Sequence, residues 1–182
     1  MFGEMGCGVI DSDAQVRAAY GSDSVRRELR AWWGDSVFLP DGSVNRKAIA
    51  RRVFDSPMER ARLEKLVHPL VAAARDREMV EVAKDRKILA FVWDTPLLFE
   101  AGLNPQCDAI VFIEADPAQR LSRVVLSRGW SQEELSRREN FQWALDKKRN
   151  FSDYVLKNDS SPNEFRGRIR ETLAQILAKT IR

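Results

Sequence analysis

The sequence lacks the residues that zinc clusters and disulfide frameworks require. Its 182 residues include one histidine, His68, and two cysteines, Cys7 and Cys107, which are far apart in the chain. A structural zinc site needs four such ligands, and a disulfide framework needs several cysteine pairs. Both are therefore excluded, and cysteine–histidine catalysis would have only His68 as its base. A cysteine-poor composition is typical of the reducing cytoplasm, where we expect the protein to act.

Long apolar runs and segregated charge are also lacking. No apolar run approaches the roughly 18 residues that span a bilayer, and the N-terminus has no basic stretch followed by an apolar one. We therefore expect neither a membrane partner nor an export signal. The 30 basic and 27 acidic residues are mixed along the chain. A nucleic-acid binder gathers its positive charge on one face, so this mixing favours an enzyme that handles small anionic molecules, with no nucleic-acid partner.

The chain has enough apolar residues, 44%, to form the core of a single domain over residues 1–182. Short, continuous apolar runs predict strands that are buried on both faces of a parallel sheet. The helices between them are expected to begin at N-cap residues followed by proline or glutamate. Strands that alternate with helices predict an α/β fold. The predicted strands are 8–10, 88–93, 109–113 and 154–156, and the predicted N-caps are Ser56, Asp116, Ser131 and Ser161.

The connection between the first two predicted strands, about 14–87, is unusually long. A crossover between parallel strands normally needs one helix, whereas this stretch predicts several. We therefore expect an inserted helical subdomain. Its predicted helices are 25–33, 46–54, 58–66 and 70–83.

Carboxylates follow the first two predicted strands, at the sheet edge where ligands bind in open α/β folds. Asp11 and Asp13 would point to the same side if the chain stays extended there, and such carboxylates accept a hydroxyl proton or hold Mg²⁺ through water. The alternative is a solvated loop, or Asp13 as a helix cap. Asp94 follows the second strand as a candidate Mg²⁺ ligand, a pattern that is frequent by chance, and Glu100 is the polar exception in an apolar stretch.

Past the third predicted strand the chain is rich in arginine. The planar guanidinium suits bidentate phosphate contacts, so this segment predicts a lid that closes over phosphates. The alternative is a solvated surface whose arginines pair with Glu133, Glu134 and Glu139. His68, before Pro69 at an expected helix start, is either a structural residue or a catalytic one. The arginines of this segment are Arg120, Arg123, Arg128, Arg137 and Arg138.

The order of these segments, over residues 2–159, resembles the dephospho-CoA kinase family. The specific elements are the Asp-x-Asp pair after the first strand, a His-Pro-Leu element and a Pro-Leu-Leu-Phe-Glu element. They stand here as Asp11-Ser12-Asp13, His68-Pro69-Leu70 and Pro96-Leu97-Leu98-Phe99-Glu100, and looser matches run through Asp41-Gly42, Arg128-Gly129-Trp130-Ser131, Lys148-Arg149 and Asn158.

This resemblance implies a P-loop-kinase-like fold in which ATP, with Mg²⁺, phosphorylates the ribose 3′-hydroxyl of dephospho-CoA in the last step of coenzyme A biosynthesis. It implies that the helical subdomain binds CoA and that about 118–150 forms the lid. Asp13 matches the family's proposed catalytic base. The remaining matched positions are Asp11, His68, Pro69, Leu97 and Glu100 on the substrate side, and Arg128, Arg138 and Asn158 on the nucleotide side.

The front of the sequence departs from the family pattern. Family members begin with a strand and a Gly-rich loop, G-x-x-x-x-G-K-S/T, and this motif occurs nowhere in the 182 residues. We therefore expect the first strand and the phosphate loop to be absent. Met1 is then an internal methionine of a longer, active kinase, which we favour, or the chain is a shortened relative that binds CoA or a nucleotide without transferring phosphate. Another small-metabolite kinase is a further alternative.

Overall fold

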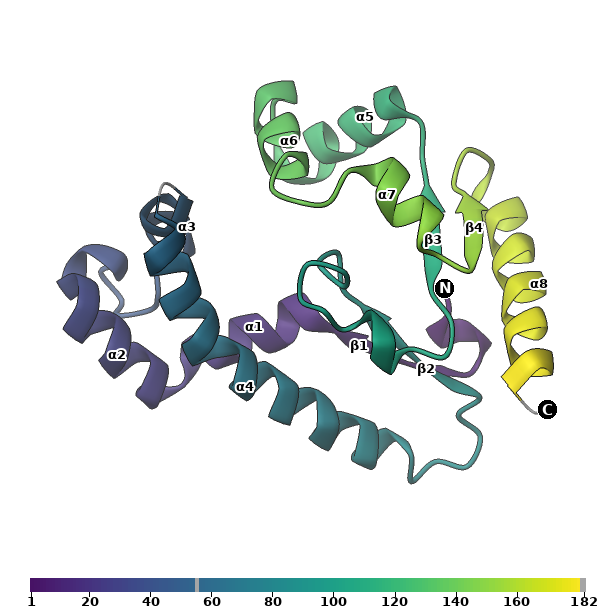
Figure 1. The fold of residues 1–182 in the computed structure, drawn as a ribbon, viewed down its shortest axis with the longest axis horizontal. Coiled ribbons are helices and arrows are strands. Elements are labelled where there is room, and N and C mark those ends of the chain that lie inside the picture. Colours follow the sequence, from purple (N-terminus) through teal and green to yellow (C-terminus); the bar gives the residue numbers. More distant parts are fainter. Residues whose placement is uncertain (55, 181–182) are drawn as a thin grey trace. The chain divides into compact units, whose positions relative to one another are not determined.

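The computed structural model describes residues 1–54 and 56–180, and it divides the chain into two compact units. The first is Cys7–Thr95, and the second joins Met1–Gly6 to Pro96–Arg182. Each unit contains one pair of parallel strands with helices beside it (Figure 1). Strands and helices therefore alternate along the chain, which confirms the predicted α/β class.

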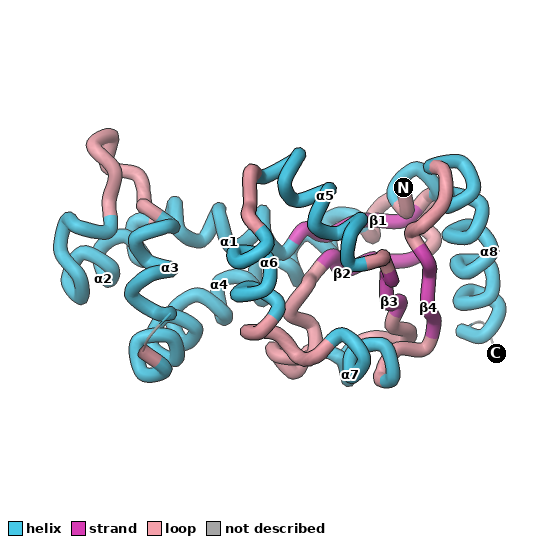
Figure 2. Tube along the Cα trace, turned by 90° about the horizontal axis from the view of Figure 1, so that it is seen from above, coloured by secondary structure: helices cyan, strands magenta, loops and turns pink. Residues whose placement is uncertain are grey.

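In the unit Cys7–Thr95, two parallel strands enclose a helical connection. Strand β1 (Cys7–Asp11) pairs with β2 (Ala90–Asp94) in a register that sets Cys7 opposite Ala90 and Asp11 opposite Asp94. Figure 2 shows the two strands side by side. Both predicted strands are confirmed, although β2 begins two residues later than expected. The helices between them are α1 (Ser12–Gly21), α2 (Asp23–Trp33), α3 (Arg46–Phe54) and α4 (Pro57–Val82), with a 3-10 turn at Gly34–Val37.

The helices of this unit have their own apolar core. Val25, Leu29 and Trp33 are spaced by four residues, so they share one face of α2, and all three are buried. Ile49 on α3 and Val67 on α4 belong to the same cluster. The helical connection therefore packs around side chains of its own, as an inserted subdomain should.

Helix α4 contradicts the sequence expectation of two helices separated at Pro69. It runs without a break over 26 residues, with Pro69 inside it. A proline in a helix removes one backbone hydrogen bond, to the carbonyl four residues earlier. Leu63 and Val67 are buried just before it, while His68 and Pro69 are exposed. Packing of the apolar face thus keeps the helix continuous, and Pro69, which cannot donate its backbone hydrogen bond, lies on the solvent side of the helix.

The second unit has the same plan. Strand β3 (Val111–Glu114) pairs in parallel with β4 (Tyr154–Lys157), so both predicted strands are confirmed within a few residues. Leu156 of β4 packs with Phe165 and Ile169, and Phe2 lies against them. Helix α8 runs beside β4 in Figure 1. The helices are α5 (Pro117–Arg128), α6 (Gln132–Glu139), α7 (Leu145–Asn150) and α8 (Pro162–Thr180), with 3-10 turns at Gly3–Met5 and Asn104–Gln106.

All four predicted helix caps are confirmed. Each side-chain oxygen accepts a backbone N–H of the first turn, which satisfies a group that has no partner within the helix. At α8 the arrangement is reciprocal, because Ser161 accepts from the N–H of Glu164 while its own N–H donates to that glutamate. The other three caps are Ser56 to Glu59, Asp116 to Ala118 and Ser131 to Glu134.

The strands are less buried than the sequence predicts. Every residue of β2 except the exposed Asp94 is half-buried, and β3 is half-buried apart from the exposed Ile113. Each strand belongs to a two-stranded sheet, so each has an unpaired edge, and continuous apolarity does not imply burial on both faces. Within residues 1–54 and 56–180, no helix combines the length and apolarity needed to cross a bilayer.

Gly8 in β1 lies where a side chain would collide with the helix behind the strand. A methyl carbon added there would lie 2.6 Å from Cγ1 of Val82 and 3.3 Å from Cδ1 of Phe91. We expect Gly8→Ala to lower the free energy of unfolding by about 1–2 kcal/mol, because overpacking forces neighbours to move. Gly167→Ala is the matched control: it meets no atom within 4 Å inside α8, and alanine should stabilise that helix. Urea unfolding of both variants tests this, and equal effects would contradict it.

Candidate functional site

Three carboxylates gather at the carboxyl ends of β1 and β2. The parallel register sets Asp11 directly beside Asp94, on strands about 4.8 Å apart. Asp13 follows in the first turn of α1. Partial burial raises the pKa of Asp94, and the negative charges of Asp11 and Asp13 raise it further. The three predicted acidic residues therefore share one electrostatic environment.

The local geometry of Asp11 and Asp13 differs from the expectation. The chain is extended at Asp11 but turns helical at Ser12, so the two carboxylates do not follow an extended strand. Asp11, rather than Asp13, caps the helix: its Oδ1 accepts the N–H of Ala14 at 2.9 Å. Its Oδ2 lies 3.5 Å from the guanidinium of Arg17. Asp13 is exposed in the first turn, where the helix dipole favours a negative charge.

These carboxylates fit a magnesium ion only together with phosphate. Among the residues that the structure describes, no three histidine, cysteine or acidic side chains converge to hold a metal ion. Mg²⁺ commonly takes one or two carboxylates and completes its shell with water and phosphate oxygens. A cation there would relieve the repulsion that raises the pKa of Asp94. Asp94 therefore fits as one carboxylate ligand of an Mg²⁺ ion that is also bound by phosphate and water.

In the second unit, Glu100 forms a buried ion pair with Lys148, which the sequence reasoning did not single out. Lys148 Nζ lies 2.8 Å from Glu100 Oε1, and the two side chains are 8% and 17% exposed. The ammonium also donates to the Pro96 carbonyl at 2.7 Å and to Gln142 Oε1 at 2.8 Å. Lys148 stands in a charged stretch, Asp146-Lys147-Lys148-Arg149, so only the fold could show that its three protons all have acceptors. This lysine ties the Pro96–Glu100 segment to the start of α7.

Burial alone would raise the pKa of Glu100, but its hydrogen bonds outweigh that effect. The ammonium of Lys148 and the backbone N–H of Trp143, 2.6 Å away, both stabilise the carboxylate, so its pKa is lowered. Beside this pair, Phe99 stacks on Trp143 with ring centroids 5.3 Å apart, and Phe151 meets both rings edge-on. Glu100 is therefore held as an anion within an ordered aromatic cluster.

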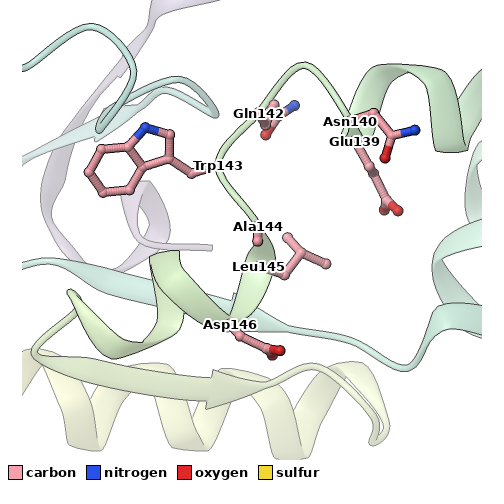
Figure 3. A pocket seen from close by; sticks show the side chains of 7 residues that line it. All are labelled: Glu139, Asn140, Gln142, Trp143, Ala144, Leu145 and Asp146. Carbon is pink, nitrogen blue, oxygen red and sulfur yellow. The ribbon is translucent and has the colours of Figure 1, made fainter.

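A hollow of about 330 Å³ lies between the end of α6 and the start of α7. Figure 3 shows its side chains, which come from the α6 end, the connecting loop and the first residues of α7. Lys147 covers the Trp143 ring at 3.6 Å from its centroid. The lining thus combines apolar, amide and acidic groups. The lining residues are Glu139, Asn140, Gln142, Trp143, Ala144, Leu145 and Asp146.

The arginine-rich segment forms two helices, α5 and α6, joined at Gly129, and its closure as a lid stays a prediction. That glycine has φ of 65°, a left-handed conformation that ends α5. Arg128 and Arg138 both lie against the Trp130 ring, with guanidinium carbons 4.8 and 4.2 Å from its centroid. The structure therefore brings these two predicted phosphate ligands together on one aromatic surface.

The alternative of local ion pairs also holds for several lid arginines. Glu134 pairs with Arg137 and, at 2.7 Å, with Arg138. Glu139 pairs with Arg120 at 3.0 Å. Arg128 differs from them, because no described carboxylate forms an ion pair with it. Arg128 and Arg123 are thus the two arginines of this segment without an ion pair among the described residues, and Arg123 donates instead to Gln119 and to the carbonyl of Asn158.

Asn158 lies at the carboxyl ends of β3 and β4. Its backbone N–H donates to the carbonyl of Glu114 at 2.7 Å, which continues the sheet pairing by one residue. Its own carbonyl accepts from Arg123 at 2.9 Å. Asn158 thus lies at the carboxyl edge of the second sheet, the edge where open α/β folds bind ligands, and its place near the nucleotide stays a prediction.

Three predicted substrate residues are not brought to these clusters. His68 and Pro69 lie exposed near the middle of α4. Helix α4 contacts α1 further along, where Glu78 accepts a hydrogen bond from Gln15. Glu78 is ten residues beyond His68, which is about 15 Å along the helix. His68 is therefore not at a helix start, contrary to expectation, and Leu97 is 48% exposed. Their roles in substrate binding stay predictions.

Parallel strands that end in carboxylates, and a crossover that carries arginines, define an α/β protein of the phosphotransferase type. The family model for dephospho-CoA kinase matches residues 1–164. The dephospho-CoA kinase of Anaeromyxobacter dehalogenans is 35% identical over 173 residues, covering 94% of this chain and 81% of its own. That of Syntrophotalea carbinolica is 31% identical and covers 97% and 84%. The chain belongs to the dephospho-CoA kinase family, whose members are ATP-dependent kinases of the final step of coenzyme A biosynthesis.

Solved structures agree with this assignment. A crystal structure of a Thermus thermophilus protein superposes with a TM-score of 0.79 at 30% identity, covering 96% of this chain and 87% of its own. A dephospho-CoA kinase from Campylobacter jejuni, at 21% identity and a TM-score of 0.61, shares the fold. The expected absence of the family's first strand and phosphate loop gains no support, because the family match begins at residue 1 and β1 begins at Cys7. It stays a prediction.

The ion pair of Glu100 and Lys148 makes a prediction about stability. At about pH 7, Glu100→Gln should lower the free energy of unfolding by about 3 kcal/mol, because it leaves a buried ammonium without its counter-charge. The double variant with Lys148→Met should recover much of that loss. Since the folded-state pKa of Glu100 is lowered, the stabilisation is present above its ordinary pKa and is lost as pH falls through the folded value.

Urea unfolding of the parent and both variants, at about pH 7 and about pH 3, measures these differences. The gap between parent and Glu100→Gln should shrink in acid. A gap that stays constant with pH would show that the carboxylate charge is not what stabilises this segment.

Proposed function

We propose that Asp13 is the general base that accepts the proton of the ribose 3′-hydroxyl of dephospho-CoA. The oxygen then attacks the γ-phosphorus of ATP in line: the new O–P bond forms, the bond to the β,γ-bridging oxygen breaks, and ADP leaves. The supporting observation is the position of Asp13, exposed at the carboxyl end of β1 beside Asp11 and Asp94.

Mg²⁺, when bound, would neutralise charge on the β- and γ-phosphates of ATP. Asp94 is the residue that we propose to hold it, together with phosphate oxygens and water. Asp11 is occupied as the cap of α1, so we propose that it fixes the start of that helix and contributes to the negative environment around the acceptor hydroxyl. Asp13 is then the carboxylate of the three that contacts the acceptor hydroxyl of the substrate.

On the nucleotide side we propose that Arg128 contacts the ATP phosphates. It lies on Trp130 with no described ion-pair partner, whereas Arg138 is paired with Glu134 at 2.7 Å and would share its charge. Asn158, at the edge of the second sheet, is proposed to lie near the adenine. Glu100 is proposed to position the Pro96–Glu100 segment through Lys148, and His68, Pro69 and Leu97 to contact dephospho-CoA.

Asp13→Asn tests the base. We expect turnover of dephospho-CoA with ATP to fall by about 10²–10⁴-fold, because an amide cannot accept the hydroxyl proton. Affinity for dephospho-CoA and the unfolding midpoint should change little. The measurement is initial-rate kinetics of ADP formation, with calorimetry for binding. The matched control is Asp85→Asn in the exposed turn after α4, where asparagine can still accept the N–H of Lys87, and it should leave turnover unchanged.

Turnover near the parental value in Asp13→Asn would remove the base assignment. A parent chain that binds dephospho-CoA yet transfers no phosphate would instead favour the non-catalytic CoA-binding alternative. Preference for a different acceptor in a panel of small alcohols would favour another metabolite kinase.

Arg128→Gln tests the lid assignment. Loss of one charge-assisted phosphate contact should raise the KM for ATP by about tenfold or more and leave the KM for dephospho-CoA within about twofold. Arg137→Gln is the control, because Arg137 forms an ion pair with Glu134. If both variants behave alike, the lid acts through its overall charge and Arg128 has no special role.

A further inference from the structure

A second hollow, of about 310 Å³, lies in the unit Cys7–Thr95 and is rich in arginine. Arg17 and Tyr20 come from α1, Arg26 from α2, and Arg46 from the first residue of α3. Asp41, in the turn before α3, is the acidic member of the lining. Three arginines thus line one hollow with a single carboxylate. From outside the lining, Asp11 contacts Arg17 at 3.5 Å and Asp23 contacts Arg26 at 3.8 Å, so Arg46 is the one of the three with no described carboxylate partner.

The carboxylate of Asp41 does not neutralise this hollow. Its Oδ1 accepts the N–H of Ser43 at 2.8 Å and the hydroxyl of Ser43 at 2.6 Å, and these bonds lower its pKa. Arg26 donates to the Gly42 carbonyl at 3.0 Å, while its Nε is buried without an acceptor. No ion pair of Arg46 occurs among the described residues. The lining therefore has more donors than acceptors, as an anion site requires.

The position of Arg46 is itself unfavourable for the fold. A cation at the first residue of a helix meets the positive end of the helix dipole, which destabilises it slightly. Burial raises the pKa of Tyr20, and the charge of Arg46 lowers it, so the guanidinium acts on the tyrosine across the hollow. Positive potential is thus concentrated here at some cost to stability, which an anionic ligand would offset.

Helix α1 connects this hollow to the proposed base. Asp13, Arg17 and Tyr20 are spaced by four and three residues, so they share one face of α1. Gln15 and Ala19, on the opposite face, are buried. One helical turn, about 5.4 Å, separates Asp13 from Arg17 along the axis. A ligand that lies along this face meets a carboxylate first and then the arginines.

We infer that this hollow binds the diphosphate of dephospho-CoA through Arg17, Arg46 and Tyr20. The inference rests on the proposed acceptor reaction. In dephospho-CoA the 5′-diphosphate is attached to the same ribose that carries the 3′-hydroxyl. A ribose whose 3′-hydroxyl meets Asp13 therefore extends its diphosphate along α1, toward groups that bind phosphate in bidentate fashion. Arg26 holds the Gly42 turn in place and closes the hollow.

The test is calorimetric titration of the full chain with dephospho-CoA, ATP and adenosine. Arg46→Gln should weaken dephospho-CoA binding by at least about tenfold, as expected for a charge-assisted phosphate contact. ATP binding should stay within about twofold, and adenosine, which has no diphosphate, should bind both proteins equally. The matched control is Lys47→Gln, the same loss of charge one residue further along α3 and outside the hollow.

Arg17→Gln is a second variant on another helix, and it should weaken dephospho-CoA binding in the same way. The unfolding midpoints of both glutamine variants should match or exceed the parent's, since neither side chain is buried. If both variants bind dephospho-CoA as tightly as the parent, the hollow is not its diphosphate site, although the proposed acceptor stands. Weakened ATP binding with unchanged dephospho-CoA binding would assign the arginines to the donor and overturn the inference. A parent that does not bind dephospho-CoA overturns both.

Discussion

The parallel register of β1 on β2 is the constraint on which the candidate site depends. It sets Asp11 beside Asp94 and starts α1 at the same edge, so Asp13 joins them. Parallel strands cannot be joined by a hairpin, and the chain must cross back over the sheet between them. In this protein that crossover is the helical connection α1–α4. The parallel pairing of β1 and β2 therefore accounts for both the position of the carboxylates and the helical connection next to them.

The second unit obeys the same requirement with different side chains. Strands β3 and β4 are also parallel, and their crossover consists of α5, α6 and α7. The arginine-bearing helices α5 and α6 are thus part of a crossover connection, just as α1–α4 are. Asn158 lies where β4 ends, next to Glu114 at the end of β3. In both units the polar residues proposed for the site lie at the carboxyl edge of the strand pair, where the crossover begins.

Features set by neighbours in sequence could be predicted. The caps at Ser56, Ser131 and Ser161 depend on a residue and the N–H three positions later, so the sequence contains all the information. The strands and the acidic residues that follow them are equally local. A helix break at Pro69 was predicted from the same kind of rule and is wrong, because buried Leu63 and Val67 outweigh the local preference.

Features set by distant partners could not be predicted. Lys148 meets Glu100 and Pro96 across about fifty positions, and no spacing rule connects them. The arginine hollow combines α1, α2 and the start of α3, so its members are scattered in the sequence. A partial signal did exist: Arg17 follows Asp13 by four residues, a spacing that places both on one face of a helix. Only the fold shows that Tyr20 and Arg46 complete that face.

The charges along α1 follow from the problem that a phosphorylated substrate creates. Burial raises the pKa of Asp94, and the negative charges of Asp11 and Asp13 raise it further; the same charges would repel a diphosphate. A site with only these carboxylates would supply a base for the hydroxyl group but would repel the diphosphate of the substrate. In the proposed binding mode, Arg17 on α1 and Arg46 at the start of α3 separate the two demands, because the hydroxyl meets negative charge and the diphosphate meets positive charge. Arg17 lies between them, within 3.5 Å of Asp11 and on the lining of the hollow, so it couples the two regions through a single side chain.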